Sequence, residues 1–150
     1  MPASLNRSDL SAAETLAGDL RAFATQLRRR LRAQADAGDL TPSQTAVLLR
    51  LESHGPATTS ALARAEGMRP QSMGAVISAL EAGGLVRGTP DPADGRQTLL
   101  SLTEACREWL ALGRAARQDW LVRAIEDQLS AEEQAQLAAA MPLLQRMAGE

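Results

Sequence analysis

The sequence predicts a mainly α-helical fold with one small β-hairpin, which places it in the α+β class. Three observations support this prediction. Apolar residues recur at intervals of three and four in several long stretches, as they do on one face of a helix. Residues that cap or stop helices separate these stretches. Two short β-prone runs, residues 85–89 and 97–102, flank a loop of turn-forming residues and predict the hairpin.

Residues 9–37 are expected to form the first helix. One apolar stripe runs along it in steps of four and three, through Leu16, Leu20, Phe23, Leu27 and Leu31. Arginines gather near its end, at positions 28, 29, 30 and 32. They could form a phosphate-binding patch, or they could reflect the preference of cations for a helix C-terminus.

Two further helices follow a break near Gly38. Thr41 and Gln44 form a capping box that starts the second helix. Its buried side is expected to contain Val47, Leu48 and Leu51. Thr58 is expected to cap the third helix. His54, the only histidine, has no partner residue for metal binding or catalysis and is interpreted as a turn residue.

The fourth helix begins at Pro70, because proline suits the first helical position. One apolar face contains Met73, Val76, Ile77 and Leu80. Gly83 and Gly84 can adopt the left-handed conformation that ends a helix. The helix therefore stops just before the first strand of the hairpin.

The opposite face of this helix carries small or neutral polar side chains. It contains Gln71, Ala75 and Ser78, flanked by Ser72 and Gly74. A solvated helix more often carries charged residues, whereas a helix that lies against another surface would carry small, uncharged side chains of this kind. Glutamine can form two hydrogen bonds with adenine, and serine can bond most base edges. The alternative is an ordinary exposed face in an alanine-rich protein.

Two helices are expected after the hairpin. Thr103 would cap a fifth helix from Glu104 to about Asp127. Ser130 opens a second capping box and starts the last helix. Pro142 lies inside that helix, where it predicts a kink or an early end.

Cys106 is the only cysteine, so the chain forms no internal disulfide. It falls in the first turn of the fifth helix. A thiol there could have a lowered pKa and act as a redox switch. Alternatively, a buried cysteine would behave as a small apolar residue.

The composition argues against several classes of function. The net charge is −2, so affinity for nucleic acid would have to come from a local basic patch. Phe23, Trp109 and Trp120 are too few aromatic residues for a single-strand binder. No catalytic triad, glycine-rich phosphate loop or metal-ligand spacing appears, so neither an enzyme nor a cofactor is expected. With no membrane-length apolar run and no signal-like N-terminus, the protein is expected to be cytoplasmic.

Three segments, in order, resemble the MarR family of bacterial winged helix-turn-helix regulators. Residues 40–49, Leu-Thr-Pro-Ser-Gln-Thr-Ala-Val-Leu-Leu, look like the family's second helix. Residues 61–63 followed by 67–72 resemble its helix-turn-helix. The end of the recognition helix and the wing are matched by residues 80–86 and then by Asp91, Asp94, Arg96, Leu102 and Thr103.

The resemblance implies a single domain with two parts. Residues 41–103 would form the winged helix-turn-helix DNA-binding lobe, and residues 9–37 and 104–150 the dimerisation helices. A homodimer would bind a pseudo-palindromic operator in double-stranded DNA and repress transcription, and a small molecule would relieve the repression. Residues that could line the ligand pocket, or could simply be core, are Phe23, Leu48 and Trp109.

The resemblance also implies which residues contact DNA. At the start of the third helix, phosphates would be bound by Thr58, Thr59 and Ser60. The groove edge would be contacted by Arg69, Gln71 and Ser72, with Ser78 further along the helix. The wing would contribute Arg87 and Arg96. Arg96 would enter a narrow minor groove, which attracts arginine. Asp94 could pair with Arg96 and hold it in shape, or could serve only as a turn former.

The sequence departs from the family pattern in its recognition helix. Members often carry arginine at the positions of Pro70, Ala75 and Ala79, and a basic residue at Ala93 in the wing. These changes imply weaker DNA binding or more reliance on the wing and on Arg69. Two other functions stay open: a redox sensor that acts through Cys106, and a protein-binding winged helix with no DNA role.

Overall fold

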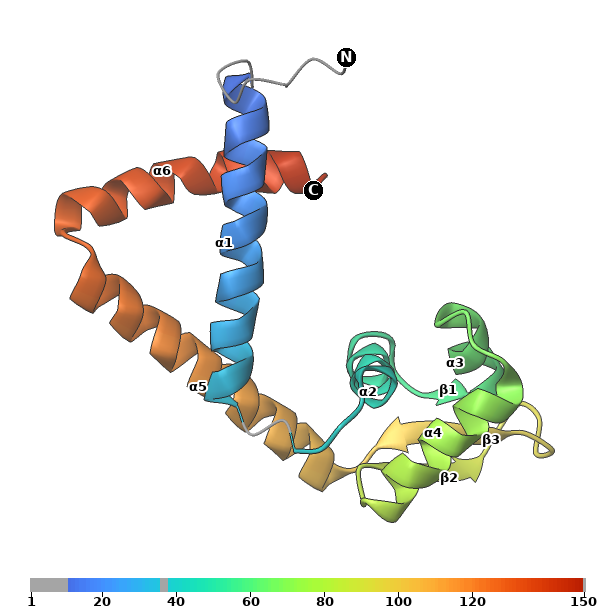
Figure 1. Cartoon of the computed structure of the whole chain (residues 1–150). Coiled ribbons are helices and arrows are strands. Elements are labelled where there is room, and N and C mark those ends of the chain that lie inside the picture. The colour runs from blue at the N-terminus through green and yellow to red at the C-terminus, as the bar shows by residue number, and fades with distance from the viewer. Residues whose placement is uncertain (1–10, 36–37, 150) are drawn as a thin grey trace, which may run out of the picture. The chain divides into compact units, whose positions relative to one another are not determined.

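The computed structural model describes residues 11–35 and 38–149, and Figure 1 shows the arrangement of their helices and strands. In chain order the elements are α1 (Ala12–Gln34), α2 (Pro42–His54), β1 (Ala57–Thr58), α3 (Thr59–Ala65), α4 (Pro70–Ala82), β2 (Val86–Pro90), β3 (Thr98–Leu102), α5 (Glu104–Gln128) and α6 (Ala131–Ala148). The chain is mainly helical with a small antiparallel sheet, as the sequence predicts.

The elements divide into two compact units. We call residues 38–115 the winged unit, which contains α2 to β3 and the first half of α5. We call residues 11–35 together with 116–149 the helical unit, which contains α1, the second half of α5 and α6.

The sheet of the winged unit has three strands in the order β1-β3-β2, all antiparallel. The sequence predicts only β2 and β3. Val86 pairs with Leu102 at one end of that hairpin, and Pro90 pairs with Thr98 at the other. The third strand, β1, consists of Ala57 and Thr58, which pair with Leu100 and Leu99 of β3. Two residues are too short to show the alternation that reveals a strand in a sequence.

The core of the winged unit lies between its helices and this sheet. Its largest fully buried side chains are Val47, Leu48, Leu62, Met73, Leu80, Leu100, Leu102 and Cys106. Each buried leucine of this kind contributes about 1.5–3 kcal/mol relative to an exposed one. Because Met73, Ile77 and Leu80 fix one side of α4 in this core, its other side faces outwards.

Both α3 and α4 end in the same glycine-dependent turn. After α3, Gly67 has φ +63°, and the Met68 amide donates to the Ala63 carbonyl at 2.8 Å. After α4, Gly84 has φ +71°, and the Leu85 amide donates to the Leu80 carbonyl at 3.0 Å. These are the hydrogen bonds of the Schellman motif. Of the two glycines expected to end α4, Gly84 alone is left-handed, because Gly83 keeps a helical φ of −78°.

In the helical unit, α1 begins at Ala12 after the Ser11 cap and is shorter than the predicted span. Residues 9, 10, 36 and 37 of that prediction lie outside the described residues.

The expectation that Pro142 would end the last helix early is wrong, since α6 continues to Ala148. The proline leaves the carbonyl of Ala138 without a donor, and Ala138 is exposed, so water can bond this carbonyl. Within residues 11–35 and 38–149, none of the helices combines the length and the apolarity needed to cross a membrane.

Substituting Gly84 by alanine should destabilise the protein by about 1–2 kcal/mol, because the alanine Cβ is strained at this positive φ. Urea unfolding followed by circular dichroism measures the effect. Gly74→Ala is the matched control: Gly74 is inside α4, its added Cβ meets no atom within 4 Å, and alanine there should stabilise the helix by about 0.5–1 kcal/mol. Equal changes in the free energy of unfolding of the two variants would contradict the role given to Gly84.

Candidate nucleic-acid interface

The outward face of α4 is exposed and carries no charge. Gln71, Ser72, Ala75 and Ser78 are all exposed. They are spaced so that Gln71, Ala75 and Ser78 share one side of the helix, opposite the buried Met73. The first charged residue after Arg69 is Glu81, so the first three turns of the helix are neutral. This face can offer hydrogen bonds and methyl groups, but no ionic contact.

Arg69 stands directly before this face. It is the N-cap residue of α4, is exposed, and makes no side-chain cap hydrogen bond. The turn that leads to it is held from outside by an ion pair between Arg50 of α2 and Glu66 at the end of α3, with 2.7 Å between Nε and Oε1. The sequence alone does not predict this pair, because no local pattern links residues that lie 16 positions apart. Among the residues that the structure describes, none forms a hydrogen bond or ion pair with the Arg69 side chain, so its guanidinium is available to a ligand beside the start of α4.

The three hydroxyl residues at the start of α3 differ in exposure. Thr58 is half-buried and its Oγ1 accepts a hydrogen bond from the Ala61 amide at 3.2 Å, which makes it the helix cap. Its hydroxyl proton can still donate to another oxygen. Thr59 is also half-buried, whereas Ser60 is exposed. Of the three, Ser60 presents its hydroxyl most openly.

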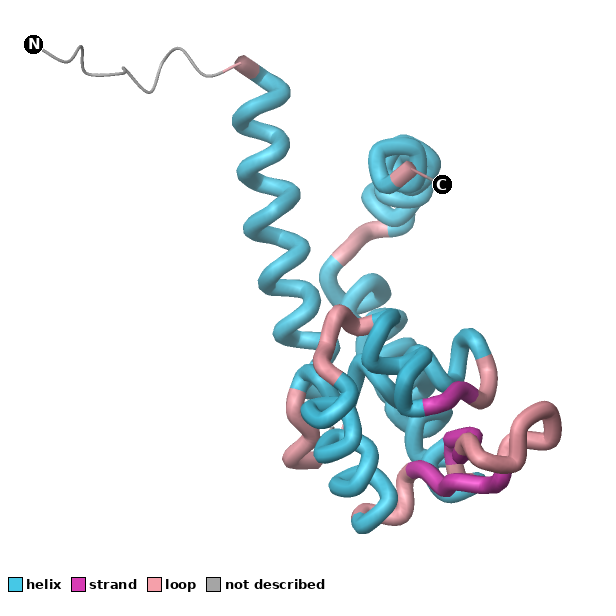
Figure 2. The backbone as a smooth tube through the Cα atoms, turned by 90° about the vertical axis from the view of Figure 1, so that its right-hand side faces the viewer, coloured by secondary structure: helices cyan, strands magenta, loops and turns pink. Residues whose placement is uncertain are grey.

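Figure 2 shows the wing loop, which connects β2 to β3. In this loop Arg96 forms hydrogen bonds with Asp94. Asp94 Oδ1 accepts hydrogen bonds from the Arg96 amide at 3.1 Å and from Arg96 Nε at 3.3 Å. The Gln97 amide donates to the Asp94 carbonyl, and the Asp91 amide donates to the Gln97 carbonyl, both at 2.9 Å. The pairing of Asp94 with Arg96 is thus as predicted. The Arg96 side chain remains 93% exposed, so its outer nitrogens can reach a ligand.

Arg87 lies on the same hairpin. It is exposed on β2, where it pairs with Ser101 of β3. The winged unit thus presents four exposed arginines on or beside its proposed DNA-contacting elements: Arg64 on α3, Arg69 before α4, Arg87 on the hairpin and Arg96 in the wing loop.

Thr103 joins the wing to α4 and α5. Its Oγ1 donates to the Gly84 carbonyl at 2.7 Å and accepts from the Cys106 amide at 3.1 Å, while its own amide donates to the Leu85 carbonyl at 3.0 Å. The sequence predicts the cap on α5 but not the bonds to the end of α4. One residue therefore fixes the end of the recognition helix, the end of the hairpin and the start of α5 together.

Cys106 is fully buried in the core of the winged unit. Burial raises the pKa of its thiol, and the negative charge of Glu52 raises the pKa further against a smaller opposing effect of Arg107. The expectation of a small apolar residue is confirmed. A redox switch would need an accessible thiol with a lowered pKa, and Cys106 meets neither condition.

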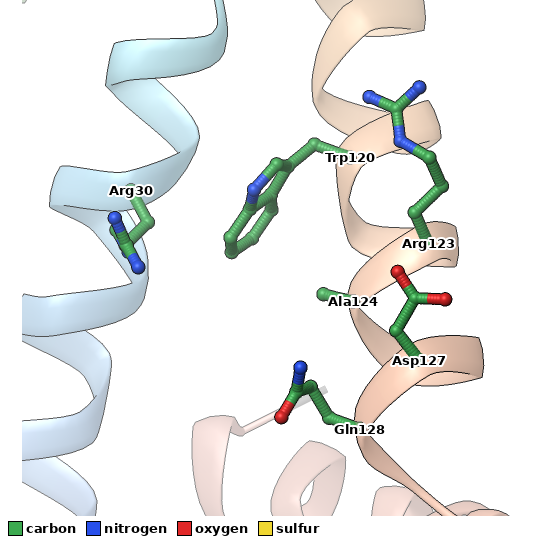
Figure 3. A pocket seen from close by; sticks show the side chains of 6 residues that line it. All are labelled: Arg30, Trp120, Arg123, Ala124, Asp127 and Gln128. Atoms are coloured by element: carbon green, nitrogen blue, oxygen red, sulfur yellow. The ribbon is translucent and has the colours of Figure 1, made fainter.

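The three residues considered for a ligand pocket lie in different environments. Leu48 is core, Trp109 packs against that core from α5, and Phe23 is 57% exposed on α1. A pocket of about 460 Å³ in the helical unit has a different lining: Arg30, Trp120, Arg123, Ala124, Asp127 and Gln128. Figure 3 shows the Trp120 indole projecting from α5 towards α1, which carries Arg30. The lining combines an aromatic surface, two guanidinium groups and one carboxylate, that of Asp127, so positive charge is in excess. This excess and the aromatic surface suit a small organic anion.

A further ion pair ties α5 to α2 within the winged unit. Arg114 Nη1 lies 2.7 Å from both carboxylate oxygens of Glu52. Glu52 and Arg114 are far apart along the chain, so, as with Arg50 and Glu66, the sequence alone does not predict their pairing.

Comparison with known proteins gives consistent matches. A model of the MarR family matches residues 40–98. An HTH-type transcriptional regulator of Mycobacterium bovis is 41% identical over 106 residues, which cover 71% of this chain and 74% of that protein. A transcriptional repressor of Pseudomonas putida is 33% identical over 72 residues, which cover 48% of this chain and 46% of the repressor.

Solved structures share the fold. A transcriptional regulator from Pseudomonas aeruginosa has a TM-score of 0.79 at 40% identity, and the match covers 94% of this chain and 99% of that one. An S. aureus protein bound to an oligodeoxyribonucleotide has a TM-score of 0.71 at 19% identity, covering 89% of this chain and 97% of that one.

The raised pKa of Cys106 predicts a loss of stability at alkaline pH. The folded state disfavours the thiolate, so the free energy of unfolding should stay level below the pKa of the unfolded thiol and fall as the pH rises beyond it. The chain contains neither lysine nor tyrosine, so Cys106 is the one side chain that titrates between about pH 8 and 10.5. Urea unfolding across this range should show the fall in the wild type. Cys106→Ala should lack it, and a parallel fall in both proteins would refute the assignment.

Proposed function

The chain belongs to the MarR family of DNA-binding transcriptional regulators, and we propose that it is a repressor that binds a pseudo-palindromic operator as a homodimer. The observation that carries this proposal is the combination, within one unit, of a neutral exposed face on α4 and a wing arginine held by Asp94. The protein is not an enzyme.

In the proposed complex, α4 lies in the major groove and the wing lies along the neighbouring minor groove. The N-terminal residues of a recognition helix contact base edges, which assigns this role to Gln71 and Ser72. Arg96 enters the minor groove, whose negative potential attracts arginine. Phosphates are bound by Arg69, Arg87 and the hydroxyl groups of Thr58, Thr59 and Ser60. Ser78 lies further along the same face of α4.

The proposed homodimer explains the apolar surface of the helical unit. Neither α1 nor α6 has a buried residue in this chain. Large exposed apolar side chains on these two helices are Leu16, Phe23, Leu137, Met141, Leu143 and Met147. Apolar surface on this scale marks an interaction site. A second copy supplies the matching surface and, through its two-fold symmetry, the second DNA-binding unit that a pseudo-palindrome needs.

Repression and its relief form the remaining part of the proposal. The P. putida relative is a repressor, and a dimer bound to an operator can block access to a promoter. We place the effector in the pocket lined by Trp120, Arg30 and Arg123, where a small organic anion would find both an aromatic face and cations. Such a ligand can change DNA binding only through unequal affinity for the bound and free conformations.

Arg96→Ala should weaken binding to operator DNA and lower the salt dependence of binding. In the minor groove the Arg96 guanidinium displaces counterions from the neighbouring phosphates. Each phosphate charge neutralised in this way adds about 0.9 to the slope of log affinity against log salt concentration, so losing Arg96 should lower the slope by about one. Fluorescence anisotropy of labelled upstream DNA across a salt series measures both quantities. Arg146→Ala on α6 changes the net charge equally and should leave affinity and slope near the wild-type values. If the two variants bind alike, the wing contact is wrong.

Introducing charge on the apolar face of the helical unit should dissociate the dimer. The wild type should sediment at twice the 15.9 kDa mass of the chain. The double variant Leu16→Glu and Met141→Glu should sediment as a monomer, because burying an unpaired carboxylate in an interface is costly. Leu49→Glu, at a similarly exposed leucine in the winged unit, is the matched control and should remain dimeric. A monomeric wild type at micromolar concentration would exclude the proposed assembly.

A further inference from the structure

We infer that the face of α4 formed by Gln71 and Ala75 selects A·T base pairs, with Gln71 binding adenine and Ala75 packing against a thymine methyl group. This inference rests on the proposed docking of α4 in the major groove. It adds the class of sequence that the protein reads.

The geometry of α4 brings these two side chains to the same surface. They are four residues apart, and the core contacts of Met73, Ile77 and Leu80 hold them on the outer side. Both are exposed, and the Gln71 side chain makes no hydrogen bond to another described residue. Four residues span about 6 Å along a helix, little more than one turn, so the two side chains are neighbours on the helix surface. The two side chains can therefore contact the same short step of DNA.

The chemistry of this face favours adenine over guanine. Guanine presents two acceptors in the major groove and is most often bound by two donors of arginine or lysine. Arg69 is the N-cap residue, and no cation follows it through Leu80. Adenine presents one acceptor and one donor, which match the amide nitrogen and oxygen of Gln71.

Ala75 extends the same preference. Its methyl group has no hydrogen-bonding capacity, so it can contribute only apolar contact, and thymine alone presents a methyl group in the major groove. Ser78 follows on this face and can bond to either kind of base pair, so it adds no preference. The neutral face thus discriminates between base pairs, while the arginines outside it supply the attraction to phosphate.

The substitution Gln71→Glu tests the inference. Glutamate keeps the size of glutamine but can only accept hydrogen bonds, which suits the cytosine amino group. Selection from a random duplex library with the full-length protein should yield A·T pairs at one position in each half-site for the wild type. Gln71→Glu should change the preferred base there from adenine to cytosine. The relative affinity for the two bases should change about five- to hundredfold, measured on duplexes that differ at this position only.

Glu81→Gln is the reverse exchange at the other end of α4 and serves as the matched control. It should alter affinity for all duplexes equally. Gln71→Glu should remain folded, because a carboxylate is favourable in the first turn of a helix, and its circular dichroism spectrum verifies this. If the wild type selects G·C at this position, or if Gln71→Glu leaves the base preference unchanged, the inference fails while DNA binding stands. If the wild type binds no duplex at low salt, the proposed function fails with it.

Discussion

The hydroxyl group of Thr103 is the contact on which the geometry of the winged unit depends. It bonds to the carbonyl of Gly84, which is available because Gly84 turns the chain back through a left-handed conformation. The same oxygen caps α5 through the Cys106 amide. The end of α4, the end of β3 and the start of α5 therefore meet at one side chain. A change in the direction of any of these three elements at Thr103 would move the recognition helix relative to the wing.

The winged unit separates two tasks that many DNA-binding surfaces combine in one helix. In the proposed complex its neutral face on α4 lies against bases, while Arg69 lies before the helix and Arg87 and Arg96 lie on the hairpin. Phosphate contacts supply much of the affinity without sequence information. In the proposed complex the Asp94 carboxylate orients the arginine of the wing, through its hydrogen bonds with the Arg96 amide and Nε.

The sequence predicts local features well. The capping boxes at Thr41 and Ser130, the start of α4 at Pro70 and the pairing of Asp94 with Arg96 all depend on residues within four positions of each other. What the sequence misses is set by tertiary folding. Strand β1, the Arg50–Glu66 pair and the Arg114–Glu52 pair join segments that meet only in the folded chain. The pocket around Trp120 was missed for the same reason.

The outer face of α4 has a consequence for evolution. Its side chains make no contacts that hold the fold together, and substitutions at such surface positions usually change stability by less than about 0.5 kcal/mol. If α4 reads bases as proposed, mutation can therefore change the bases that it reads without a loss of stability. After gene duplication, two copies of this protein can acquire separate sets of target genes through a few changes on one helix, while the buried face and the wing stay the same.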